Sequence, residues 1–176
     1  MELLDFTDTP TTGDEALDPH TMRGLEHAAA GDWHAAAQAF EMAVDTAERE
    51  RIADVSRDHD AHEARLAVAL TNLGQARAHQ GSLDVATALL RRGLAVRERM
   101  AATGAAGPLI VARTLVDLAA VVGAGGETDE ARDILVRAEA LAGTTGGPLQ
   151  HAILDGLAML GAPAAATADL PLLSFD

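Results

Sequence analysis

The chain has 176 residues, of which 48% are hydrophobic and only 2% aromatic, so it is long enough for one domain with a core of Ala, Leu and Val. Its 13 basic residues are all arginine and are outnumbered by 27 acidic ones. The net charge of −14 argues against binding to nucleic acid or to anionic membranes, and it favours a basic partner. The absence of cysteine excludes disulfides, thiol catalysis and thiolate metal sites.

The two ends of the chain differ from its body. Residues 1–16 are acidic and lack a helical stripe, and residues 162–176 contain two prolines, so both are predicted to be flexible tails. The opening stretch MELLDFTDTP lacks the basic region and apolar run of a secretory signal, and no stretch reaches transmembrane length, so we expect a cytoplasmic location. Between the tails there is no sustained alternation of polar and apolar residues, which predicts an all-α fold.

A repeated pattern organises residues 17–142. Three glycines each end one helical pattern and precede another: Gly31, Gly81 and Gly126. Five residues after each glycine stands a small residue, and four further on stands a large apolar one. The small residues are Ala36, Ala86 and Ala131, and the large ones are Phe40, Leu90 and Leu135. Another small residue precedes each glycine by seven positions (Gly24, Gly74 and Ala119), which predicts helix hairpins whose two helices approach closely.

The residues around the turns support the same interpretation. Asp32, Ser82 and Glu127 or Thr128 follow the glycines, where side-chain oxygens cap the start of a helix. In GDWHAAAQAF, residues 31–40, Trp33 is therefore expected to pack over the first hairpin rather than to form a catalytic site with its polar neighbours. Proline after Gly107 and after Gly147 is placed to open two further helices.

These residues resemble the tetratricopeptide repeat family. The family pattern is an aromatic or apolar residue, Leu-Gly three positions on, and then Ala-x-x-x-Phe in the second helix. LTNLGQARAHQGSLDVATALL (70–90) fits this pattern best and LVDLAAVVGAGGETDEARDIL (115–135) nearly as well, with leucine in place of phenylalanine in both and Leu-Ala in place of Leu-Gly in the second. LLRRGLAVRER (89–99) is similar to the long-repeat form of kinesin light chains and of many bacterial regulators. The resemblance implies an antiparallel helix-hairpin solenoid within residues 17–161. Its units would be residues 17–58, 59–104 and 107–143, followed by a capping helix at 147–161.

The resemblance also implies a function, because such stacks bind partner proteins along a concave groove. By the repeat register, eight residues would line that groove. They are Val68, Thr71, Asn72, Gln75 and His79 from the second unit and Arg113, Val116 and Asp117 from the third. The carboxylate clamp of co-chaperones in this family is incomplete, because Thr21 and Leu25 stand where a lysine and an asparagine would be needed. We therefore expect a non-enzymatic adaptor, chaperone-like or regulatory module that binds a protein or peptide.

The alternatives rest on fewer residues. Ser56, Ser82 and Ser174 are the only serines, and none lies in a nucleophile turn, so no catalytic residue is assigned. His59 and His62 are three apart and form a weak candidate metal site in an accessory protein, although no third ligand is indicated. No cofactor is expected.

Two similar short motifs lie in the tails. ELLDF (residues 2–6) and PLLSFD (residues 171–176) share the pattern Leu-Leu-x-Phe next to acidic residues. Apolar anchors of this kind pack on the terminal helices, dock elsewhere on the same chain, join a second copy into a homo-oligomer, or bind a partner. The sequence leaves these possibilities open.

Overall fold

The computed structural model describes residues 18–53, 59–143 and 147–161, and this part of the chain is all-helical, as predicted. The helices are α1 (Pro19–Ala29), α2 (Trp33–Ala53), α3 (His59–His79), α4 (Leu83–Ala102), α5 (Pro108–Ala124), α6 (Thr128–Ala142) and α7 (Pro148–Met159). The described residues contain no strand. Both predicted tails, residues 1–16 and 162–176, lie outside the described residues.

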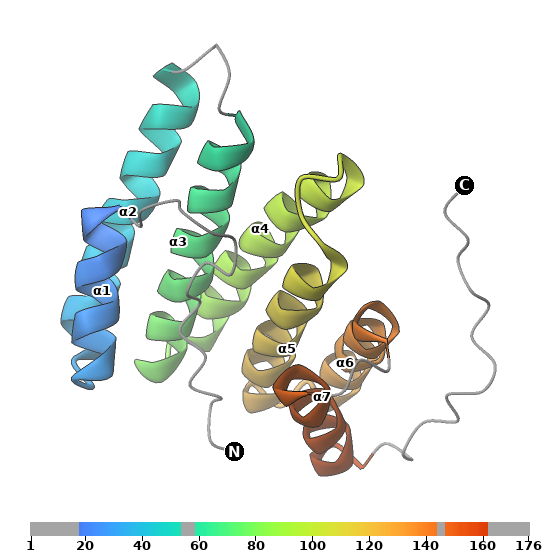
Figure 1. Ribbon diagram of the computed structural model, residues 1–176. Helices are drawn as coiled ribbons and strands as arrows, with labels where there is room; N and C mark the ends of the chain where they lie inside the picture. Colours follow the sequence, from blue (N-terminus) through green and yellow to red (C-terminus); the bar gives the residue numbers. More distant parts are fainter. Residues whose placement is uncertain (1–17, 54–58, 144–146, 162–176) are drawn as a thin grey trace.

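The helices form hairpins that pack side by side (Figure 1). The pairs α1–α2, α3–α4 and α5–α6 are each joined by a short turn, and each hairpin also packs on the next one along the chain. Ion pairs connect α4 to α2 through Arg92 and Glu48, and α4 to α6 through Arg91 and Glu130. Helix α5 contacts α3 and α7. The even-numbered helices therefore line one side of the molecule and the odd-numbered helices the other.

The predicted turns lie where the glycine pattern places them. Gly31, Gly81 and Gly126 have φ values of 75°, 78° and 94°, a conformation that residues with a side chain adopt at a cost. The Asp32 carboxylate accepts a hydrogen bond from the Ala35 N–H at 3.0 Å, so it caps α2 as expected. Ser82 occupies the N-cap position of α4, but its hydroxyl makes no capping hydrogen bond.

Close helix contacts explain two of the small residues in the pattern. A Cβ at Gly24 would overlap the ring of Phe40, and a Cβ at Gly74 would lie 2.8 Å from Cγ of Leu90. Both large residues are fully buried. The glycines therefore bring α1 onto α2 and α3 onto α4 at a distance that a side chain would prevent.

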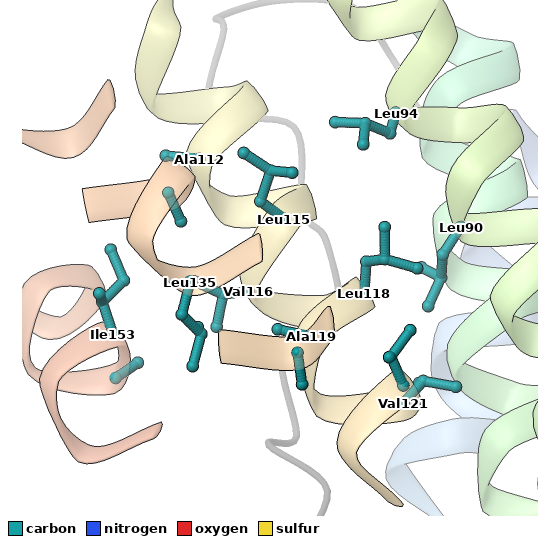
Figure 2. Packing of buried hydrophobic residues seen from close by; sticks show 14 of the residues in the cluster. Leu90, Leu94, Ala112, Leu115, Val116, Leu118, Ala119, Val121, Leu135 and Ile153 are labelled. Carbon is teal, nitrogen blue, oxygen red and sulfur yellow. The ribbon is translucent and has the colours of Figure 1, made fainter. Parts of the chain in front are cut away.

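The buried apolar residues form two clusters that meet at α4. One cluster joins α1, α2, α3 and α4 around Phe40 and Leu70. The other extends from α3 to α7 and includes Leu90, Leu115 and Ile153. Figure 2 shows this second cluster, in which side chains from α4, α5, α6 and α7 point toward one another. The core is thin, as the composition predicts, because alanine, leucine and valine supply most of it.

Candidate functional site

Buried polar side chains are concentrated on α3, α4 and α5. Outside this region, the described residues bury only one polar side chain, Thr21, whose hydroxyl and N–H bond to the capping carboxylate of Asp18. On α3, α4 and α5 the buried polar residues are His62, Glu63, Thr71, Asn72, Arg97, Thr114 and Asp117. Burial of polar groups is costly unless they are hydrogen-bonded, so these side chains are expected to find partners within the protein.

Four predicted groove residues share one face of α3. Each residue of an α-helix turns the chain by 100° about the helix axis. Counted in this way from Gly74, four positions lie about 100–160° around α3, namely Val68, Asn72, Gln75 and His79. Gly74 abuts α4, so these four positions lie on the part of α3 that is turned away from its hairpin partner. Three of the side chains are partly exposed, whereas Asn72 is only 1% exposed.

Helix α5 repeats this arrangement with charged residues. Arg113 and Asp117 stand at the positions equivalent to Val68 and Asn72, relative to Ala119. Arg113 is partly exposed, and Asp117 is 5% exposed. We call the set of Val68, Asn72, Gln75, His79, Arg113 and Asp117 the inner row.

The other two predicted groove residues are placed differently. Thr71 is fully buried, its hydroxyl donates to the Ala67 carbonyl oxygen at 2.9 Å, and a Cβ at Gly93 of α4 would lie 3.2 Å from that hydroxyl. Val116 is also buried, within the apolar cluster that extends to α7. Both residues thus contribute to packing between helices. The solvent-exposed surface of the predicted groove residues comes from the inner row.

Arg97 is a buried polar residue that the sequence pattern did not predict. This residue follows Leu90 and Leu94 on the apolar stripe of α4, and it is 4% exposed. Its guanidinium donates a hydrogen bond to the Thr114 hydroxyl of α5, and Thr114 precedes Asp117 by one helical turn. The sequence did contain a signal for this buried residue, because an arginine stands where the stripe of α4 is otherwise apolar. An arginine at such a position is buried only when polar groups pair with it.

Trp33 joins two hairpins. Its ring stacks on the His79 ring of α3, with centroids 3.7 Å apart and an interplanar angle of 3°. The Gln80 side-chain amide donates to the Trp33 carbonyl oxygen at 2.8 Å. The sequence placed Trp33 over the first hairpin, whereas its stacking partner belongs to the second. The contact anchors one end of the inner row, because His79 is its last residue on α3.

The histidines of the weak metal candidate have different environments. His59 is exposed at the start of α3, whereas His62 is buried, with Nδ1 2.7 Å from an Arg65 nitrogen and 3.6 Å from a Glu50 oxygen. An arginine so close to the imidazole disfavours a cation there. Within residues 18–53, 59–143 and 147–161, no three His, Cys, Asp or Glu side chains are grouped as metal ligands.

Glu63 forms a separate ion-pair cluster beside His62. Its side chain is buried and lies 2.6 Å from an Arg99 nitrogen and 3.9 Å from an Arg51 nitrogen. The two arginines come from α4 and α2, so this carboxylate connects the ends of three helices. We assign it a structural role.

Comparison with known proteins leaves the family open. The chain matches no family model and none of the curated sequences. Within the described residues, no helix is both long and apolar enough to cross a membrane. The Leu-Leu-x-Phe motifs of both tails lie outside the described residues.

Proposed function

We propose that this chain is a non-enzymatic protein–protein interaction module of the tetratricopeptide type, an antiparallel helix-hairpin solenoid that binds a partner segment along the inner row. The observation that carries the proposal is the inner row itself. It places polar and charged side chains at equivalent positions of two successive hairpins, on the helix faces turned away from the hairpin partner. A regular row of this kind suits an extended segment, whose backbone groups repeat along its length.

The charge of the whole chain influences the choice of partner. A net charge of −14 attracts a basic protein over long range and raises the rate of encounter. Close contacts in the row then decide which part of that protein binds. The partly exposed amide group of Gln75 suits a peptide backbone, and the partly exposed guanidinium group of Arg113 suits a carboxylate or carbonyl oxygen.

Site-specific photocrosslinking tests the proposal. A photoreactive residue at Gln75, in the inner row, is expected to capture a partner from the native host, whereas one at the exposed Ala95 of α4 is not. The captured partner, once purified, is expected to bind the Gln75→Ala/Arg113→Ala variant at least about tenfold more weakly, corresponding to about 1.4 kcal/mol. The matched Arg91→Ala variant on the opposite side should bind normally. Equal affinities for all three proteins would contradict the proposal.

A further inference from the structure

We propose that the exposed face of α7 binds residues 163–170 of the same chain as the second helix of a fourth hairpin. The inference goes beyond the proposed function, because it concerns the end of the stack rather than the inner row. Three observations carry it: the turn that ends α7, the face that α7 leaves exposed, and the pattern of the residues that follow the turn.

Helix α7 ends in the same turn as the first helix of each hairpin. Gly161 has a φ of 67°, in the same left-handed region as the turn glycines Gly31, Gly81 and Gly126. The Gly161 N–H donates to the carbonyl oxygen three residues earlier, as the N–H groups of those three glycines also do. In the three hairpins this turn leads the chain back along the helix that it has just left. We expect the chain to take the same course after Gly161.

The first helices of the hairpins bury a face that α7 exposes. This face comprises the residues three, seven and ten positions before the turn glycine, and it contacts the second helix through Gly24 and Gly74. In α1 and α3 it is buried throughout, at Thr21, Gly24, Ala28, Thr71, Gly74 and Ala78. In α5 it is buried at Val116 and Ala119 and partly exposed at Gly123. All three corresponding residues of α7 are exposed, namely His151, Leu154 and Ala158, so no helix among the described residues covers this face.

The residues after Gly161 have the start and end of a second helix. The second helices begin two positions after the turn glycine, at Trp33, Leu83 and Thr128. Pro163 stands at this position, and proline suits the first residue of a helix because its missing N–H would have no partner there. Pro171 ends the segment, since a proline disfavours the helical conformation of the residue before it. The two prolines that suggested a flexible tail therefore fall at the two ends of one short helix.

The same segment repeats the packing pattern of the second helices. Ala166 is the small residue five positions after the turn glycine, and Leu170 is the large apolar one nine positions after it. They correspond to Ala86 and Leu90 in the second hairpin, both of which are fully buried. A helix of eight residues is unstable on its own in water, so this one would form only by packing its apolar side on α7.

Side-chain sizes are exchanged between the two sides of the proposed contact. In the second hairpin, Gly74 on the first helix makes room for Leu90 on the second. In α7 the position equivalent to Gly74 is taken by Leu154, whereas residues 163–170 include four alanines. Small side chains on the segment leave room for the Leu154 side chain, so the two helices can still pack closely.

Attachment and length favour this segment over a second copy of the chain as the occupant. The segment begins two residues after Gly161, so it reaches the exposed face of α7 without a linker. Its eight residues span about 12 Å as a helix, and the 12 residues of α7 span about 18 Å, so the segment fits along α7. A short tether gives an effective concentration on the order of millimolar, which a separate copy reaches only in concentrated solution.

Hydrogen exchange on the full-length chain tests the inference. In a helix that starts at residue 163, the N–H groups of residues 167–170 bond to carbonyl oxygens one turn earlier, whereas those of the first turn have no such partner. The amides of residues 167–170 should therefore exchange at least about tenfold more slowly than in a free peptide of residues 162–176. The amides of residues 172–176 should exchange at the rates of that peptide.

Two pairs of variants locate the contact. Leu170→Ser should restore the rates of the free peptide, whereas Leu173→Ser, in the same tail but beyond Pro171, should leave the protection unchanged. On α7, Leu154→Lys should abolish the protection and Met159→Lys should not. Met159 is 65% exposed and Leu154 is 39% exposed, so neither substitution threatens the fold. Met159 lies outside the shared face, although it is the more exposed of the two.

Three results would overturn the inference. The first is free-peptide exchange rates at residues 167–170 of the unmodified chain. The second is equal loss of protection in the test and control variants, which would remove the contact from the shared face of α7. The third is protection that rises with protein concentration, which would identify a second copy as the site of docking. Protection that is independent of concentration and lost only in Leu170→Ser and Leu154→Lys would support the fourth hairpin.

Discussion

Gly24 and Phe40 set the distance between α1 and α2. Replacing Gly24 by alanine places a methyl group against the fully buried phenylalanine ring, which must then shift. The overpacking is expected to lower the free energy of unfolding by about 1–3 kcal/mol, less the gain of up to about 1 kcal/mol from the better helix former. Urea denaturation followed by circular dichroism measures the net loss.

Gly107 provides the matched control for this substitution. A Cβ there would meet open space, and its backbone has a negative φ that alanine adopts freely. Gly107→Ala should therefore lower the free energy of unfolding by less than about 1 kcal/mol, a cost that comes from alanine being a poorer N-cap residue for α5 than glycine. Equal effects at the two glycines would show that the close approach of α1 and α2 is not set by Gly24.

The stack between Trp33 and His79 offers a direct optical reading, because Trp33 is the only tryptophan. His79→Ala is expected to shift the fluorescence of Trp33 and to cost about 0.5–1.5 kcal/mol of stability, the usual contribution of an aromatic pair. His34→Ala is the control, since His34 is adjacent in sequence but exposed and paired with Gln38. Identical emission spectra for both variants and the unmodified chain would contradict the stacking.

These residues show what the sequence could and could not predict. The turn glycines and the pairs Ala36–Phe40 and Ala86–Leu90 were predictable, because a turn and the face of a helix depend only on nearby residues. The contact of Trp33 with His79 was not, because it depends on how one hairpin sits on the next. The burial of Thr71 escaped prediction for the same reason: the helix period gives its direction, but only the packed neighbour α4 shows that the space is filled.

Helices α2, α4 and α6 are connected by arginine–glutamate pairs across the even-numbered side. Arg92 with Glu48, Arg91 with Glu130, and Arg137 with Glu98 each join two different helices. All three pairs are substantially exposed to solvent, so screening limits the contribution of each. They join neighbouring hairpins at the surface, whereas buried alanine and leucine provide most of the stability.

A double-mutant cycle on Arg92 and Glu48 measures that contribution. Replacing each residue by alanine, alone and together, should give a coupling energy of about 0.2–1 kcal/mol at low salt. The coupling should decrease as salt is added, because both side chains are reached by solvent. The same cycle on Arg92 and Asp45, which carry no mutual ion pair, should give no coupling. A coupling that persists in high salt would contradict the exposed geometry of the Arg92–Glu48 pair.

Across the described part of the molecule, α4 belongs to both apolar clusters. Leu90 of α4 lies in the cluster that extends to α7, and Val96 of the same helix lies in the cluster that reaches α1. Leu90→Ala is expected to cost about 2–5 kcal/mol and to lower the stability of all the hairpins together. Hydrogen exchange resolved by segment should therefore show faster opening in α2 as well as in α6.

Ile153 is the terminal counterpart of Leu90. It is also fully buried, but it lies on α7, which among the described helices packs mainly on α6 and α5. Ile153→Ala should accelerate exchange mainly in α7 and leave α1 to α4 unchanged, because each hairpin is stabilised by its immediate neighbours. Equal acceleration throughout the chain would show that the hairpins unfold as a single unit.

Because each helix packs mainly on the helices next to it in the chain, the native contacts join residues that are close in sequence. Chains with such local contacts form their native state within microseconds to milliseconds, since no long loop has to close first. A growing chain can thus complete its first hairpins before the later ones leave the ribosome. Local contacts of this kind allow the hairpins to form in the order of their synthesis.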